Sequence, residues 1–176
     1  DFTGGSGAIN INGNVVIGAT GSFTESSTTT NVEGNLTSTG TFTQNGGTFT
    51  FDGAGNSVLD GGTINFNNLV VNKTSTAAEV EINDGAIIVN ANTSLNIIRG
   101  TFDFQEFGGN GHQLGTVSGT ADAIIALAGP EGGAVVFPMG TTDLTSFVNT
   151  AGTTINFNTA NNYTIPNAPP GATNYQ

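Results

Sequence analysis

Apolar and polar residues alternate along most of the chain in short runs, and a glycine precedes many of them. In Gly47–Asp52 phenylalanine takes every second position, and the same form returns in Gly62–Asn67. Side chains at alternate positions of a β-strand point to opposite faces. We therefore predict short strands that bury one face. The residues expected to point inward are Phe49, Phe51, Ile64, Phe66, Phe102 and Phe104.

This glycine-led unit and a second unit both recur. Further copies of the first are Gly100–Gln105 and Gly152–Asn158, while the second, Ile11–Val15, returns as Val32–Leu36. Comparable segments lie roughly fifteen to twenty-one residues apart, and imperfect periods near this length are typical of solenoids. One turn cannot bury its apolar face alone, but stacked turns close a continuous core and pair their backbones. The pattern predicts an all-β fold, a repetitive β-solenoid resembling a parallel β-helix.

A β-sandwich also presents short alternating strands with frequent turns, so it stays open as the alternative architecture. Long helices are not expected, because no stretch carries apolar residues at a sustained three-to-four spacing. The apolar run Ala121–Ala128 contains adjacent isoleucines and is flanked by Gly-Thr and Gly-Pro. We predict that this run forms a buried strand.

Proline marks a change near the end of the chain. Pro138, Pro166, Pro169 and Pro170 fall in roughly the last forty residues, and proline interrupts strands or confines them to sheet edges. We therefore divide the chain into a stacked β-repeat region at residues 1–136 and a second part at residues 137–176. The second part is either a variant coil or the start of a next repeat.

Composition narrows the function classes. Charged residues make up 9% of the 176, whereas about a quarter is usual, yet 12 Phe argue against disorder. The 13 acidic residues against two basic ones, Lys73 and Arg99, give a net charge of −11. Because phosphate binding needs clustered Lys and Arg, neither nucleic acid nor anionic lipid is an expected partner. No apolar run approaches the roughly eighteen residues of a membrane span, so membrane insertion is not expected.

Candidate catalytic groups are few. His112 is the single histidine and is expected in a surface turn. Parallel β-helices include polysaccharide lyases and glycosidases, which use paired carboxylates or carboxylates set with a basic residue. Asp103, Glu106 and Arg99 come closest to such a set, but solvated strand-edge charges explain them more simply. We predict no catalytic residue and no enzyme, and a carbohydrate-active β-helix enzyme stays as the alternative.

No cofactor is predicted, although calcium suits the composition. Asp, Asn and main-chain carbonyls supply the hard oxygen ligands that Ca²⁺ prefers, and the chain is rich in all three. Asn83–Gly85 and Asp52–Asn56 are the loops that could contribute. Neither matches an EF-hand loop, and ordinary turn chemistry explains both. The sequence leaves the metal question open.

A flat threonine-rich face could bind ice or the hydroxyl groups of a polysaccharide. Thr41–Thr43 and Thr48–Thr50 both read Thr-Phe-Thr. An ice-binding plane would repeat this pattern on successive turns, and we expect Asn65 and Asp103 to interrupt it. Strand propensity explains outward threonines first.

The stretch Gly34–Lys73 resembles the repeats of very long, adhesin-like surface proteins of Bacteroidota, many of them exported by the type IX secretion system. The similarity is greatest in Thr63–Asn72, and Phe137–Asn167 resembles another recurrent element of such proteins. The resemblance covers most of residues 10–166, carries no catalytic signature, and does not extend to residues 108–133. It implies that Asn174–Gln176 begins a further strand of a longer parent protein.

These features predict a structural, adhesive segment of a secreted, extracellular cell-surface protein. The segment would act as a spacer or display rod, with weak contacts to glycans or surfaces that gain strength through avidity. Expected partners are the flanking repeats of the same longer chain, together with secretion machinery or surface glycans. The opening residues lack the features of a signal peptide, which fits a mature chain or an internal fragment.

Overall fold

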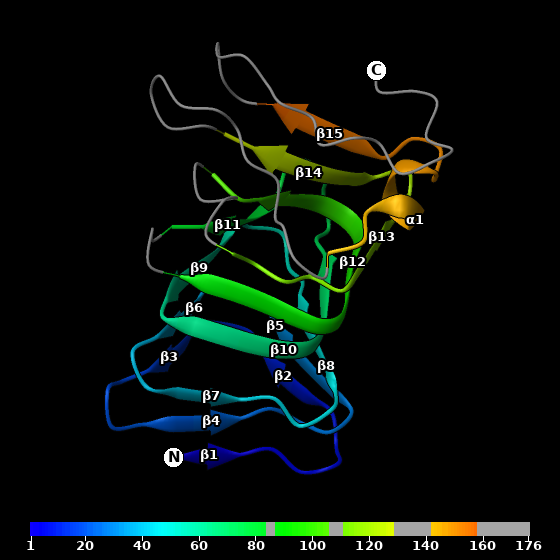
Figure 1. Ribbon diagram of the computed structural model, residues 1–176. Coiled ribbons are helices and arrows are strands. Elements are labelled where there is room, and N and C mark those ends of the chain that lie inside the picture. Colours follow the sequence, from blue (N-terminus) through cyan, green and yellow to red (C-terminus); the bar gives the residue numbers. More distant parts are fainter. Residues whose placement is uncertain (84–86, 106–110, 129–141, 158–176) are drawn as a thin grey trace.

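The chain folds as an all-β parallel β-solenoid of about five turns. The computed structural model describes residues 1–83, 87–105, 111–128 and 142–157. Successive turns stack from the blue N-terminal turn at the bottom to the orange β15 (Thr154–Phe157) near the top (Figure 1). Every ladder between the described strands is parallel, whereas β-sandwiches are built from antiparallel sheets. The predicted solenoid is confirmed, and the β-sandwich alternative is wrong.

Each of the first three turns contributes one short strand to each of three faces. Face A consists of β1 (Phe2–Thr3), β4 (Ser22–Thr24) and β7 (Thr41–Thr43). Face B begins with β2 (Ile9–Ile11), β5 (Thr29–Val32) and β8 (Thr48–Phe51). Face C begins with β3 (Val15–Ile17), β6 (Leu36–Ser38) and β9 (Ser57–Gly61). Segments rich in Gly, Asn and Ser form the corners, because these residues suit tight bends.

Two long strands continue the stack. β10 (Thr63–Asn72) and β12 (Ile88–Asp103) pair with each other, and the register shifts after Phe66 and again after Val71. Such irregularities bend a strand, so one strand can follow the solenoid around a corner. The end of β12 pairs with β11 (Glu79–Ile82), which extends face C.

The next strands complete the described stack on faces B and C. β13 (Thr116–Gly119) and β14 (Ala123–Leu127) both pair with β12. β14 lies within the apolar run Ala121–Ala128 and is largely buried, so the predicted buried strand is confirmed. The one described helix, α1 (Thr145–Val148), is a single turn.

Alternate residues of the strands fill the interior. The six residues predicted to point inward are at most 1% exposed, which confirms that prediction: Phe49, Phe51, Ile64, Phe66, Phe102 and Phe104. On face A the rings of Phe2, Phe23 and Phe42 stack in order, with centroid separations of 5.0 and 5.9 Å. A continuous apolar core therefore runs through successive turns.

The two sequence units play different parts in the fold. Ile11 lies opposite Val32 and Val15 opposite Leu36, so the second unit is a true turn-to-turn repeat. The glycine-led unit is not, because Phe49 lies opposite Leu69 rather than opposite its sequence counterpart Ile64. A corner glycine followed by an alternating strand suits any of the three faces, so this unit marks where a strand starts.

The later part of the chain also joins the stack where it is described. β15 pairs with β14, and Asp143 forms an isolated parallel bridge with Thr116. The four prolines named above and Asn174–Gln176 lie outside the described residues. The division at residue 136 stays a prediction.

Candidate functional site

The catalytic set considered from sequence does not assemble among the described residues. Arg99 forms an ion pair with Asp122 instead, at 3.1 Å between Nε and Oδ2, and both side chains are about half exposed (48% and 47%). Asp103 is buried, and Glu106 lies outside the described residues. An exposed ion pair of this kind contributes little free energy.

Asp103 lies beside carboxylates of the preceding turn. Its register partner on β11 is Glu81. Gln105 donates its backbone N–H to Asp103 Oδ1 (2.7 Å) and its Nε2 to both Asp103 Oδ2 (3.2 Å) and Glu81 Oε2 (3.3 Å). Gln105 has a φ of 50°, which is uncommon for a residue other than glycine. Its side chain therefore links two stacked carboxylates that would otherwise repel each other.

Burial changes the ionisation of this acidic group. It raises the pKa of Asp103, although the hydrogen bond from the Gln105 backbone opposes the rise. Burial also raises the pKa of Glu79, and the charges of Asp103 and Glu81 add to the effect. Sequence reasoning missed Glu79 and Glu81 as neighbours of Asp103. The missing information was the local turn length, which brings Gln105 to Glu81 across 24 residues.

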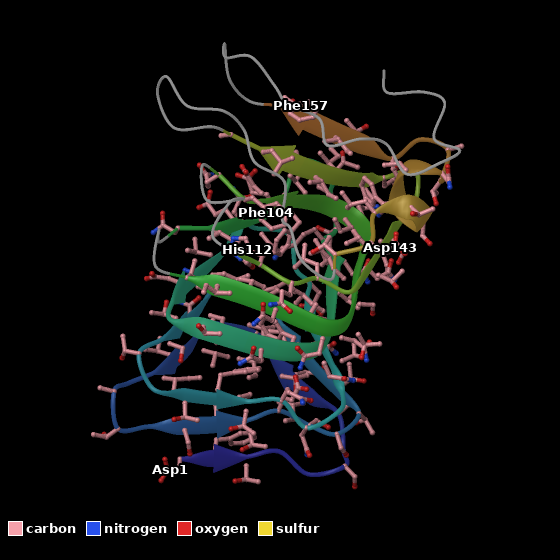
Figure 2. The ribbon with its side chains drawn as sticks, in the orientation of Figure 1. Asp1, Phe104, His112, Asp143 and Phe157 are labelled. Atoms are coloured by element: carbon pink, nitrogen blue, oxygen red, sulfur yellow. The ribbon has the colours of Figure 1, made fainter. Side chains whose placement is uncertain are left out.

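His112 is buried, so its predicted place in a surface turn is wrong. Its Nδ1 accepts a hydrogen bond from the backbone N–H of Val89 at 3.0 Å. Its ring centroid lies 5.4 Å from that of Phe104, and Figure 2 shows the two residues close together. The histidine and Leu114 are alternate residues and are both buried, as in a strand. The ring thus provides an acceptor for a backbone N–H inside the core.

The corner between faces A and B buries an acidic side chain. Glu25 is 0% exposed, its Oε1 accepts the backbone N–H of Asn45 at 3.1 Å, and its Oε2 has no hydrogen-bond partner. Burial raises the pKa of Glu25, against the lowering effect of hydrogen bonds from the Asn45 and Gly47 backbones. The neighbouring Ser26 and Thr30 are also buried, and the Ser26 N–H donates to the Thr30 hydroxyl at 3.0 Å.

The corner between faces B and C buries a basic side chain. Lys73 is 1% exposed, and its Nζ donates to the carbonyl oxygen of Asp52 (2.6 Å) and to the Ser57 hydroxyl (2.7 Å). The Ser57 hydroxyl donates to the carbonyl oxygen of Glu33 at 3.3 Å. Burial lowers the pKa of Lys73, and the negative charges of Asp52 and Glu33 oppose this change. One buried ammonium group therefore ties together the backbones of two successive turns.

A concave surface of about 400 Å³ lies at this corner, and we call it the corner hollow. Its lining comes from three successive turns and consists of Asn10, Ile11, Asn12, Asn31, Glu33 and Asp52. Asn31 Nδ2 donates to Asn10 Oδ1 at 2.7 Å, while Asp52 Oδ1 is buried without a hydrogen-bond partner. The hollow thus combines a concave shape, carboxamides and carboxylates, and hydrogen-bonding capacity that the protein does not satisfy.

The loops considered for calcium are only partly available as ligands. The Asn56 side chain binds Glu79, with Nδ2 donating to the Glu79 carboxylate at 2.8 Å and Oδ1 accepting its backbone N–H at 3.2 Å. Asp52 lines the corner hollow, and Asp84 and Gly85 lie outside the described residues. In the described ranges, no group of three or more His, Cys, Asp or Glu side chains is placed to hold a metal ion.

The two Thr-Phe-Thr units lie on different faces. Thr41–Thr43 forms β7 on face A, Thr48–Thr50 belongs to β8 on face B, and Asp103 lies on face C. Asp103 therefore does not interrupt a threonine plane on face A or face B, and that expectation is wrong, because the residues lie on different faces. On face A the register partners Thr3, Thr24 and Thr43 form one row of threonines over three turns.

No protein-family model matches the chain, and neither a curated protein nor a solved structure matches it. Within the described part of the chain, no helix is long and apolar enough to cross a membrane.

Proposed function

We propose that the chain is a structural, adhesive segment of a secreted cell-surface protein, acting as a spacer or display rod outside the cell. The observation that carries this proposal is the uninterrupted stack of parallel turns around a continuous core. Short polar side chains also form hydrogen bonds from turn to turn on the outer surface. Examples are Asn31 to Asn10 (2.7 Å), Asn90 to Asn65 (2.8 Å) and Ser94 to Asn68 (2.9 Å). Such a stack lengthens by adding turns and needs no separate domain interface.

The edge of the first turn supports flanking repeats of the same kind as partners. Phe2 ends the stacked row of rings on face A and is 44% exposed. A further turn of the same kind stacked on this edge would cover Phe2 and pair with the backbone of β1. The resemblance of Gly34–Lys73 to repeats of Bacteroidota adhesin-like proteins favours the same role. It also favours secretion machinery and surface glycans as further partners.

A carbohydrate-active enzyme is the second candidate, and the acidic group on face C favours it. Asp103 and Glu79 both have a raised pKa, as a general acid requires. Against this role, the Asp103 side chain is 6% exposed and its two oxygens accept hydrogen bonds from Gln105. We therefore favour the structural role. Release of reducing ends or unsaturated uronates from polysaccharides, lost in Asp103→Asn, would favour the enzyme instead.

Surface display is tested by labelling intact cells that naturally produce the chain with antibodies raised against it. We expect labelling without permeabilisation, and removal of the label by protease added outside the cells. A cytoplasmic protein probed in parallel controls for lysis. Labelling that appears only after permeabilisation would contradict the proposed function.

A further inference from the structure

We propose that the corner hollow is a glycan-binding site, in which Glu33 and Asp52 accept hydrogen bonds from the hydroxyl groups of a neutral sugar. This inference deepens the proposed surface role and rests on it. The hollow measures about 400 Å³, which falls within the usual range of sites for small organic ligands.

The solenoid places the lining residues in two rows. Asn10 and Asn31 are register partners on β2 and β5. Asn12, Glu33 and Asp52 each directly follow a strand of face B, and the backbone bonds Glu33 N–H to Ile11 and Asp52 N–H to Val32 keep the turns in step. Neighbouring strands are about 4.8 Å apart, so the backbones that carry the two acids are held at a short spacing.

Buried groups hold the backbone that carries the two acids. Lys73 Nζ donates to the Asp52 carbonyl oxygen, and Ser57 Oγ bridges Lys73 to the Glu33 carbonyl oxygen. Lys73 and Ser57 are at most 1% exposed. They act as positioning residues, because they fix the main chain and leave both acidic side chains for a ligand. A site that is rigid before binding loses less entropy when the ligand binds.

The free hydrogen-bonding capacity of the hollow matches a polyol. An ionised carboxylate only accepts hydrogen bonds, so Glu33 and Asp52 require a ligand that donates. Asp52 Oδ1 is buried and has no hydrogen-bond partner, so a ligand meets the Asp52 carboxylate only where this residue lines the hollow. The bond from Asn31 Nδ2 to Asn10 Oδ1 uses neither the side-chain N–H₂ of Asn10 nor the side-chain oxygen of Asn31. Sugar hydroxyls both donate and accept, so they fit this mixture.

Charge selects among the possible ligands. Two carboxylates on a chain of net charge −11 disfavour uronates and sulfated sugars. The ammonium group of Lys73 already compensates part of the negative charge of Glu33 and Asp52, and it would repel a divalent cation bound to them. A neutral sugar requires no further charge compensation. The geometry therefore favours neutral glycans over anionic glycans and over a metal ion.

The test is a titration of the ¹⁵N-labelled 176-residue chain, followed by NMR. The probes are cellohexaose, maltohexaose and xylohexaose, with tetragalacturonic acid as the anionic counterpart and CaCl₂ alone as the cation. We expect at least one neutral hexasaccharide to shift the side-chain amide signals of Asn10, Asn12 and Asn31. Glu33→Gln and Asp52→Asn should each weaken that binding about tenfold, since each removes a charge-assisted hydrogen bond. Asp60→Asn, on face C of the same turn as Asp52, is the matched control and should bind like the native chain.

Several outcomes would overturn the inference. These are absence of shifts with all neutral sugars, shifts located away from the hollow, or shifts with CaCl₂ or tetragalacturonic acid but not with neutral sugars. Glu33 is exposed, so Glu33→Gln keeps the test valid if Asp52→Asn does not fold. The result is independent of surface labelling. Sugar binding by a chain that is not displayed would contradict the proposed function alone, and display without sugar binding would contradict this inference alone.

Discussion

Two corners of the solenoid bury a charged side chain, and they do so differently. At the corner between faces B and C, Lys73 has two acceptors for its ammonium group and lies near two carboxylates. At the corner between faces A and B, Glu25 Oε1 accepts the backbone N–H of Asn45, while Oε2 has no partner. Both side chains are almost fully buried. The comparison indicates that the fold tolerates a buried charge in either corner but satisfies the hydrogen bonds of the lysine more fully than those of the glutamate.

Removing the ammonium group is expected to have the largest effect. Lys73→Met keeps most of the apolar stem but leaves the Asp52 carbonyl oxygen without a donor and weakens the support of Ser57. Each buried group left unsatisfied costs about 1–3 kcal/mol, so we expect a loss of about 3 kcal/mol in unfolding free energy. Urea denaturation followed by circular dichroism measures it. A loss below about 1 kcal/mol would mean that the desolvation of Lys73 nearly cancels its hydrogen bonds.

The backbone around Lys73 is expected to be nearly as sensitive. Gly100 has a φ of 101°, and a Cβ added there would lie 2.7 Å from the Ala78 carbonyl oxygen and 3.0 Å from Lys73 Cβ. Gly100→Ala should therefore cost about 2 kcal/mol through backbone strain and crowding. Gly55→Ala is the matched control, because a Cβ at Gly55 meets nothing within 4 Å. Equal melting temperatures for the two variants would contradict this account.

Glu25→Gln tests the other corner and should have the opposite sign. The substitution removes a buried negative charge whose second oxygen is unpaired, so we expect about 1 kcal/mol of added stability at pH 7. The same urea titration measures the change. A clear loss of stability would show that ionised Glu25 has a favourable partner at this corner.

The pH dependence sharpens this test. A carboxyl group with a raised pKa in the folded chain binds more protons when folded than when unfolded, so its contribution to stability falls as the pH rises. Burial raises the pKa of Glu25, Asp103 and Glu79. We therefore expect unfolding free energy to increase as the pH is lowered from 7 towards the ordinary glutamate value of 4.5. The slope should be smaller in Glu25→Gln, and an unchanged slope would assign the dependence to the other acids.

The smallest effect is expected for the exposed ion pair. Arg99→Gln removes the bond to Asp122, and both side chains are about half exposed. Exposed pairs contribute about 0–1 kcal/mol, so the midpoint of urea unfolding should move little. A loss of unfolding free energy as large as that of Lys73→Met would show that the difference in burial between Arg99 and Lys73 does not determine their contributions to stability.

The two-residue period of the strands predicts the burial of charged side chains as well as of apolar ones. Lys73 lies two residues after Val71, Glu25 two after Phe23, and His112 two before Leu114. Every one of these residues is buried. Applying the period of two to charged residues would thus have placed all three inside. The expectation that polar side chains lie outside conflicts with this period, and backbone partners make the buried positions of all three side chains possible.

The pairing of distant turns could not be predicted from the same pattern. Hydrogen-bonded partners lie 21 residues apart between Asn31 and Asn10 but 26 apart between Ser94 and Asn68. The register shifts in the β10–β12 ladder absorb the additional residues. Because the glycine-led unit fits any face, its copies gave no register. In the corner hollow, the second unit relates Asn10–Asn12 to Asn31–Glu33, but the place of Asp52 depends on the missing register, so the full lining could not be assembled from sequence.

The parallel stacking of turns also determines how the chain would respond to force. The strands lie across the axis along which the turns stack, so tension along that axis loads the bonds between turns a few at a time. A turn of 21 residues that peels away releases roughly 70 Å of extended chain before the next turn takes the load. Stretching would then proceed as a series of similar steps. An anchor built in this way would lengthen under drag and keep its remaining turns intact.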